Sequence, residues 1–120
     1  MRVPDADNAI VSKEKIVGYL LNPSHPDGAG KAGFFEHVGF RADQWQLLAA
    51  ALRDLAARSD SAQRVDSEHG TKYIVDGVIN TPSGKAASLR TVWIVDAGGQ
   101  IPRLVTAYPR ELGRSDAQGT

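Results

Sequence analysis

A proline- and glycine-rich loop, residues 22–31 (NPSHPDGAGK), holds the first side chains whose types could do chemistry. It contains His25, and imidazole changes charge near neutral pH, which suits it to general acid–base catalysis. Gly28 and Gly30 would let a phosphate approach backbone amides where a helix begins, with the Lys31 ammonium beside it. An alternative of equal weight is that the prolines and glycines only shape a turn between helices, and that His25 packs or caps locally.

A second group of candidates lies in the C-terminal half, where polar residues interrupt apolar, β-branched segments. Arg90 and Thr91 are neighbours in one segment, Thr106 and Tyr108 lie in the next, and Lys72 lies in an earlier one. If these segments are adjacent strands, the five side chains could meet in one concave polar patch. A single Arg or Thr on a strand is more commonly an ordinary solvent-facing residue, so the prediction depends on their convergence.

Motifs of several common enzyme classes are missing from the sequence. The loop lacks the GxxxxGK[ST] spacing and follows no predicted strand, which excludes a nucleotide-triphosphate P-loop. There is no GxSxG, no HExxH and no aspartate–glycine calcium loop. Neither His37 nor His69 has a histidine partner at helical spacing, so no histidine-based metal site is indicated. We therefore expect neither a metal nor a cofactor.

Three helices are predicted in the N-terminal half to position the first group. Apolar residues at helical spacing follow the capping residue Ser12 and predict a helix over 12–21. A second helix is predicted over 31–38, ending at Gly39, because glycine suits the left-handed position after a helix. The third, over 43–58, has the clearest helical period and is expected to cover a sheet.

The hydrophobic period changes from 3.6 to 2 after residue 62, which indicates strands. The connections are short and rich in turn residues, which favours an antiparallel meander. Helices followed by such a sheet predict an α+β domain, with about three helices on one face of four antiparallel strands. Strict alternation places Leu104, Thr106 and Tyr108 on one side of the last strand. The predicted strands are 63–67, 72–79, 88–95 and 103–108.

Length and composition indicate one domain of ordinary globular character. The chain has 120 residues, 42% of them hydrophobic, and no cysteine. The missing cysteines exclude a disulfide scaffold, a cysteine-ligated zinc site and a thiol nucleophile, and make the cytoplasm the simplest location. No apolar stretch is long enough to span a membrane. The polar ends predict a flexible N-terminus over 1–8 and a flexible tail over 110–120, around a single domain at 9–109.

The charges of the chain balance. Fourteen basic and fourteen acidic residues give a formal net charge of zero. The general positive field that gathers nucleic acids is therefore missing, which counts against a high-affinity DNA-binding protein. Any site for an anion must be local.

Several motifs resemble a small bacterial domain family without an assigned function, over nearly all of residues 9–109. That family is in turn similar to the barnase, EndoU, colicin and RelE group of ribonuclease toxins. In this group, helices precede a four-stranded antiparallel sheet whose last strand ends in a Thr-x-Tyr-Pro-like motif. The motifs that carry the resemblance are YLLNPSHPDG at 19–28, KA at 31–32, FF at 34–35, GF at 39–40, GTKY at 70–73, DG at 76–77, RTVW at 90–93 and TAYP at 106–109.

The resemblance implies a metal-independent ribonuclease toxin that cleaves RNA through attack by the 2′-hydroxyl, together with a dedicated immunity or antitoxin partner. Such cleavage needs a base, an acid, and cations or amides around the charged phosphorane. The expected catalytic set is His25 for proton transfer, Arg90 for phosphate charge, and Thr106 and Tyr108 for positioning or proton donation. The expected phosphate-binding set is Gly28, Gly30, Lys31, Lys72 and Thr91.

Two other functions stay open at this point. As a protein-binding module, the chain would be the immunity or antitoxin member of a pair and would hold its partner on a sheet face or edge strand, which the zero net charge favours. As a third option, it would be a non-catalytic accessory domain of a mobile-element or phage-type protein. We expect no DNA or membrane partner in any of these cases.

Overall fold

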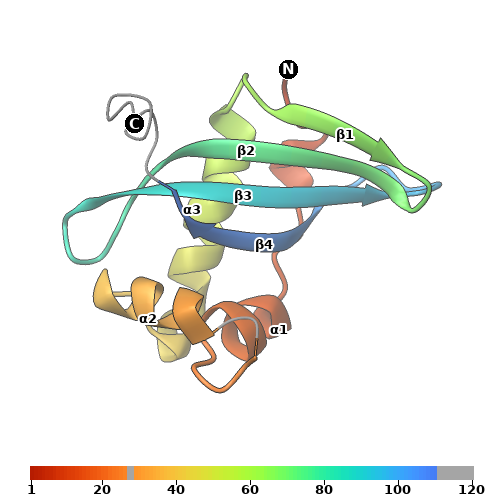
Figure 1. The fold of residues 1–120 in the computed structure, drawn as a ribbon. Helices are drawn as coiled ribbons and strands as arrows, with labels where there is room; N and C mark the ends of the chain where they lie inside the picture. Colours follow the sequence, from red (N-terminus) through yellow and green to blue (C-terminus); the bar gives the residue numbers. More distant parts are fainter. Residues whose placement is uncertain (27–28, 111–120) are drawn as a thin grey trace, which may run out of the picture.

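The computed structural model describes residues 1–26 and 29–110, and it has the predicted α+β architecture, with helices first and strands after them (Figure 1). The helix α1 continues directly into η2, a π-helical segment in which the amide of Leu21 donates to the carbonyl of Ile16. The helical elements are η1 (Ala6–Asn8), α1 (Lys13–Lys15), η2 (Ile16–Leu20), α2 (Ala29–His37), η3 (Ala42–Gln44) and α3 (Trp45–Arg58).

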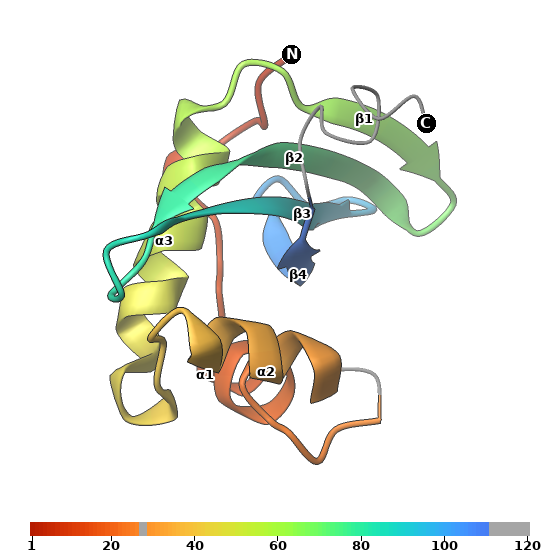
Figure 2. The same cartoon turned by 60° about the vertical axis from the view of Figure 1, so that its left-hand side comes forward.

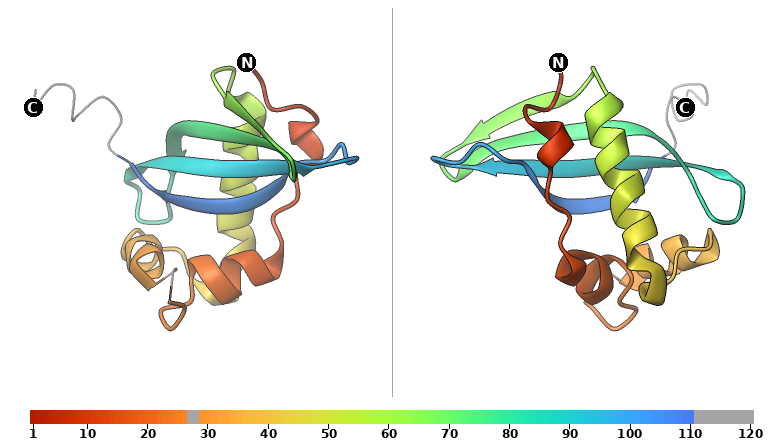
Figure 3. Two further views of the ribbon diagram at one scale, coloured as in Figure 1. Left: turned by 45° about the vertical axis from the view of Figure 1, so that its right-hand side comes forward. Right: turned by 180° about the vertical axis from the view of Figure 1, so that it is seen from behind.

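Four antiparallel strands form a meander in the order β1-β2-β3-β4. Their bounds are β1 (Gln63–Ser67), β2 (Gly70–Asn80), β3 (Ala86–Asp96) and β4 (Arg103–Pro109), so the strands predicted from sequence are confirmed, three of them slightly longer than expected. The helix α3 crosses one face of the sheet, as Figure 3 shows from behind. The helices α1 and α2 lie instead beyond β4, the last strand of the sheet (Figure 2). These two helices are thereby brought close to the final strand, β4.

The core fills the space between α3 and the sheet. The apolar face of α3 that the sequence predicts is buried, including Leu48, Leu52 and Leu55. A β-carbon added at Gly77 of β2 would lie 2.5 Å from a methyl carbon of Leu55, so this glycine allows the helix to approach the strand closely. Trp93 of β3 is completely buried in the same layer. This packing fixes one face of the sheet as covered and leaves the other uncovered.

A β-bulge changes which side chains of β4 share a face. Val92 pairs with Thr106, but Trp93 pairs with Leu104, so one residue of β4 is extra at this point. Leu104 therefore points to the covered face and is buried, whereas Thr106 lies on the uncovered side. The prediction that Leu104, Thr106 and Tyr108 share one side was wrong, because an inserted residue shifts the alternation by one position. Tyr108 lies opposite Arg90, on the uncovered side with Thr106.

The N-terminal residues pack against the domain, in contrast to the loose segment expected over 1–8. Val3 and Ala6 are buried, and the amide of Ala62 donates to the carbonyl of Met1. Further on, Ile10 forms a parallel bridge with Arg103 at the beginning of β4. Apart from its first residue, the tail expected over 110–120 lies outside the described residues. No helix in the described ranges has the length and apolar character needed to cross a membrane.

Candidate active site

Tyr19 in η2 connects the predicted catalytic loop to the sheet. Its hydroxyl forms a hydrogen bond with the hydroxyl of Thr106 in β4, with 3.0 Å between the two oxygens. Its ring meets the imidazole of His25 edge-on, with 4.9 Å between ring centroids. Short π-helical segments are rare and often occur at functional sites. Through Tyr19, a histidine near the start of the chain and a threonine near its end share one site.

Two lysines surround the same aromatic ring. The ammonium nitrogen of Lys15 lies 5.0 Å from the ring centroid of Tyr19, and that of Lys31 lies 5.4 Å from it. Both distances are within the range of cation–π attraction. We call Lys15, Tyr19, His25, Lys31 and Thr106 the tyrosine cluster. It combines two cations, an imidazole and two hydroxyls, which are the group types that transfer protons and bind phosphate.

An open hollow lies beside the tyrosine cluster. It has a volume of about 450 Å³ and is lined by Gly30 and Lys31 from α2 and by Tyr108 and Pro109 from β4. This volume falls within the range of small-ligand sites, roughly 300–1,000 Å³. The structure therefore brings Lys31 and Tyr108, with Gly30, to one hollow beside β4, and it connects His25 and Thr106 with each other through Tyr19.

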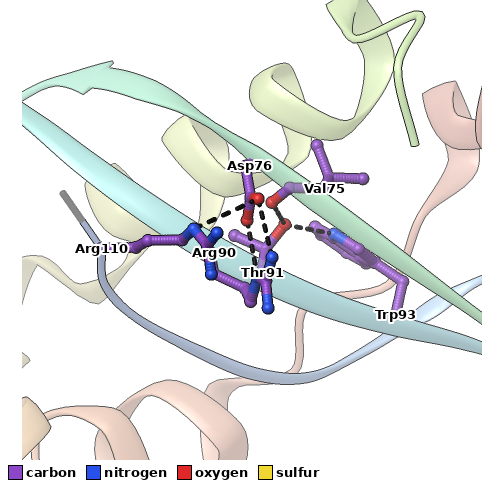
Figure 4. Close-up of polar contacts among 6 residues, drawn as sticks. All are labelled: Val75, Asp76, Arg90, Thr91, Trp93 and Arg110. Atoms are coloured by element: carbon purple, nitrogen blue, oxygen red, sulfur yellow. Dashed lines mark hydrogen bonds and ion pairs between the residues drawn. The ribbon is translucent and has the colours of Figure 1, made fainter. Parts of the chain in front are cut away.

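Arg90 stands on the uncovered face next to this edge, held by a carboxylate. Its guanidinium donates to both oxygens of Asp76 at 2.8 and 2.9 Å, and Arg110 lies 3.5 Å from the same carboxylate (Figure 4). These Arg90 hydrogen bonds, with the charges of Arg90 and Arg110, hold the pKa of Asp76 below its ordinary value, against the opposing effect of burial. The pKa of Arg90 is raised chiefly by Asp76, with a smaller contribution from Tyr108. Arg90 thus stays charged, but most of its charge is already compensated.

Thr91 is separated from the site by the sheet itself. It is completely buried on the covered face, where its hydroxyl donates to the carbonyl of Val75 at 2.9 Å and accepts from the indole of Trp93 at 2.8 Å (Figure 4). Both hydrogen-bonding functions of the hydroxyl are used, and a phosphate has no access to it. Thr91 is therefore not available to bind phosphate, in contrast to the expectation from sequence. Alternation along a strand does not tell which of its two faces is covered.

Two further residues, Lys72 and Gly28, are expected from the sequence to bind phosphate. Lys72 is exposed on β2, opposite Ile94, and takes part in none of the contacts of the tyrosine cluster or its hollow. Gly28 lies outside the described residues. Among residues 1–26 and 29–110, no group of three or more histidine, aspartate or glutamate side chains is arranged to hold a metal ion.

Sequence reasoning missed Tyr19 and Lys15 as site residues. Both occur in the segment predicted as a one-faced helix, where they read as ordinary positions on its surface. The available signal was position: Tyr19 stands three residues before the loop that begins at Asn22. An amphipathic phenol at the junction between a helix and a candidate catalytic loop is well placed to contact both.

Comparisons with known proteins agree with this fold. No curated protein matches the chain. One solved structure, a "contact-dependent growth inhibition toxin - immunity protein complex from Klebsiella pneumoniae 342", contains a similar chain, with a TM-score of 0.69 and 20% sequence identity. The similarity covers 84% of this chain and 99% of that chain, and at this identity it shows the fold. Residues 2–111 match the family described as a domain of unknown function (DUF6883), and the chain belongs to that family.

Proposed function

We propose that the chain is a metal-independent ribonuclease of the toxin type, which cleaves RNA through attack of a 2′-hydroxyl on the adjacent phosphate. The observation that carries this proposal is the tyrosine cluster, where His25, two lysines and two hydroxyls converge at one edge of the sheet. The similarity in fold to a chain of a toxin–immunity complex supports a toxin or immunity context. The activity itself is argued from the site, because one fold hosts many functions.

In the proposed reaction, His25 is the general base and Tyr108 is the general acid. His25 accepts the proton of the 2′-hydroxyl while the 2′-oxygen forms a bond to phosphorus. The bond from phosphorus to the 5′-oxygen then breaks, and the Tyr108 hydroxyl donates the proton that this leaving oxygen takes up. The products are a 2′,3′-cyclic phosphate and a free 5′-hydroxyl. Atoms and charges balance without an oxidant, a reductant or a metal.

Lysines supply the positive charge in this proposal. Lys31 borders both the tyrosine cluster and the hollow, so its ammonium can reach a phosphate lying there. Lys15 adds a second cation on the same ring. Fixed cations around a phosphorane stabilise its extra charge in the transition state. Arg90 does not bind the phosphate in this proposal, because two of its nitrogens are already bound to Asp76. It acts instead as a positioning residue for Tyr108, which lies opposite it on β4.

The test is digestion of total RNA by the purified chain in the presence of a chelator such as EDTA. The wild type is expected to cut RNA and to leave cyclic phosphate ends. His25→Ala is expected to lose about 10²–10⁴-fold of the rate, the usual share of general acid–base catalysis. His69→Ala changes an exposed histidine in the turn after β1 and serves as the matched control. An inactive wild type, or a His25→Ala variant as active as the wild type, would contradict the proposal.

A second candidate is the immunity or antitoxin member of such a pair. The zero net charge favours it, and so does the edge strand β1, whose residues are all exposed and could pair with a partner strand. Production of the chain alone in bacteria separates the two candidates. Growth arrest that a cognate immunity protein relieves supports the toxin. Normal growth, with protection against a separately produced toxin, supports the immunity member.

A further inference from the structure

A second hollow continues from the first on the other side of Pro109, which lines both. It has a volume of about 300 Å³ and lies between Phe34 of α2, with Val38 directly after that helix, and Ala87 of β3. The ring of Phe34 packs edge-on against Phe35, with 5.4 Å between centroids, which fixes its orientation. The walls are therefore mainly apolar, with an aromatic ring on one side.

The turn between β2 and β3 is fixed against the end of α2, so the walls of this hollow are held in place. The amide of Ser83 donates to the carbonyl of Val38 at 3.1 Å. Gly39 has a φ of +102°, and a β-carbon there would lie 3.0 Å from Pro82, which shows how closely the two segments approach. Within the turn, the Thr81 hydroxyl donates to the carbonyl of Lys85 at 2.6 Å. Lys85 therefore belongs to a turn that hydrogen bonds hold in place.

Two cations border the same hollow. Lys85 is exposed and forms no ion pair within the part of the chain that the structure describes. Arg110 is anchored by its amide, which donates to the carbonyl of Ser88 at 2.9 Å, and it shares Asp76 with the more tightly bound Arg90. No described residue that lines the hollow is acidic. The apolar, aromatic walls favour a flat apolar group, and the two cations favour an anionic group. A ligand that carries both would therefore fit the hollow.

We propose that this hollow is a flanking subsite, which binds the nucleotide next to the scissile phosphate of a single-stranded RNA. The base would lie against Phe34, Val38 and Pro109, and its phosphate between Lys85 and Arg110. Stacking of bases on aromatic rings, combined with cations along the backbone, is the usual way in which proteins hold single strands. The inference rests on the proposed ribonuclease function, because the two hollows share Pro109 and a strand leaving the first would enter the second.

The test measures binding of a short, fluorescent 2′-O-methyl oligoribonucleotide, which cannot be cleaved by 2′-hydroxyl attack. Fluorescence anisotropy with the full chain is recorded at several salt concentrations. Lys85→Glu is expected to weaken binding about tenfold and to reduce the slope of log affinity against log salt by at least about 0.7, the share of one phosphate contact on a single strand. The matched control is Arg53→Glu on α3, which makes the same change in net charge at a position that lines neither of the two hollows.

Cleavage of an unmodified oligoribonucleotide separates failure of this inference from failure of the proposed function. A wild type that binds but does not cleave, with binding weakened in Lys85→Glu, keeps the hollow as a nucleotide-binding subsite and refutes the ribonuclease. A Lys85→Glu variant that is folded by circular dichroism and binds like the wild type refutes the subsite, whatever the cleavage rate. A wild type that binds no oligonucleotide also refutes the subsite, including the case in which a protein partner occupies the hollow.

Discussion

Two threonines on neighbouring strands lie in polar networks of opposite character. Thr91 is completely buried, and its hydroxyl is fully used by a backbone carbonyl and by the indole of Trp93. Thr106 is half-buried at the edge of the sheet and bonds to Tyr19, whose ring contacts His25. The first network is closed within the core, whereas the second joins side chains from three segments beside an open hollow. The type of a residue therefore indicates a functional site only where several polar groups converge within reach of a ligand.

The sheet itself separates the two networks. Thr91 and Val92 are successive residues of β3 and so point to opposite faces, and Thr106 pairs with Val92. The covered face, under α3, excludes water, so every polar group there must find a partner in the protein. The edge beyond β4, where α1 and α2 lie, is under no such constraint (Figure 2). We therefore expect changes in the closed network to affect stability, and changes in the tyrosine cluster to affect activity.

Apart from that of His25→Ala, the largest effect is expected on activity, from Lys31→Ala in the tyrosine cluster. Loss of one cation that faces the developing charge is expected to lower kcat/KM for RNA about hundredfold. The free energy of unfolding is expected to fall by less than about 1 kcal/mol, the share of one exposed cation–π contact. Lys13→Ala, at an exposed lysine of α1, is the control. A Lys31→Ala variant with unchanged cleavage would show that the tyrosine cluster, like the closed network, does not serve RNA cleavage.

The next effect is on stability, from Thr91→Val in the closed network. The change keeps the shape of the side chain but leaves the Trp93 indole without its buried acceptor, which costs about 1–3 kcal/mol. Urea unfolding measures the loss, and RNA cleavage at low temperature is expected to be unchanged. Thr91→Ser retains the hydroxyl and is expected to preserve the indole hydrogen bond, which the NMR shift of its proton reports. A Thr91→Val variant as stable as the wild type would show that this network is not structural.

A smaller and pH-dependent effect is expected from Asp76→Asn. The side chain of Asp76 is 29% exposed, and its ion pair with Arg90 is expected to stabilise the fold by about 1–2 kcal/mol at pH 7. Because the pKa of Asp76 is lowered in the folded state, this stabilisation is present above the ordinary value near 4. It is lost as the pH falls through the lowered pKa.

Urea unfolding at pH 7, 5 and 3 checks this pH dependence. The difference between wild type and Asp76→Asn is expected to be full at pH 7 and to shrink towards pH 3. Asp54→Asn, which removes an exposed ion pair with Arg58, is the matched control and is expected to change stability by less than about 1 kcal/mol. A stability difference between wild type and Asp76→Asn that grows as the pH falls would show that the ion pair does not lower the pKa of Asp76 in the folded state.

Much of the fold could be predicted from the sequence because its signals are local. Apolar residues repeat with a period of 3.6 in α3 and alternate with polar residues in β2 and β3. Both patterns can be seen in consecutive residues, and the structure has the corresponding elements. The bulge in β4 could not be predicted, since it depends on how Val92 and Trp93 pair with a distant strand. Strict alternation therefore wrongly placed Leu104 on the same side of β4 as Thr106 and Tyr108.

The candidate site was predictable only in part, for a related reason. His25 and Lys31 belong to a loop whose composition is unusual, and Thr106 and Tyr108 belong to a motif at the end of a strand. Tyr19 has only its position near that loop as a signal, because its role depends on where α1 and α2 lie relative to β4. The position of one helix against a distant strand is a tertiary property that hydrophobic periodicity does not encode.

A double-mutant cycle on RNA cleavage in the presence of chelator, with His25→Ala and Tyr19→Phe, measures whether His25 and Tyr19 act together. If both side chains serve one site, each single change lowers the rate, and Tyr19→Phe costs much less in the His25→Ala background than in the wild type. Rate losses that simply multiply, or a Tyr19→Phe variant as fast as the wild type, would show that the two side chains do not serve one catalytic site.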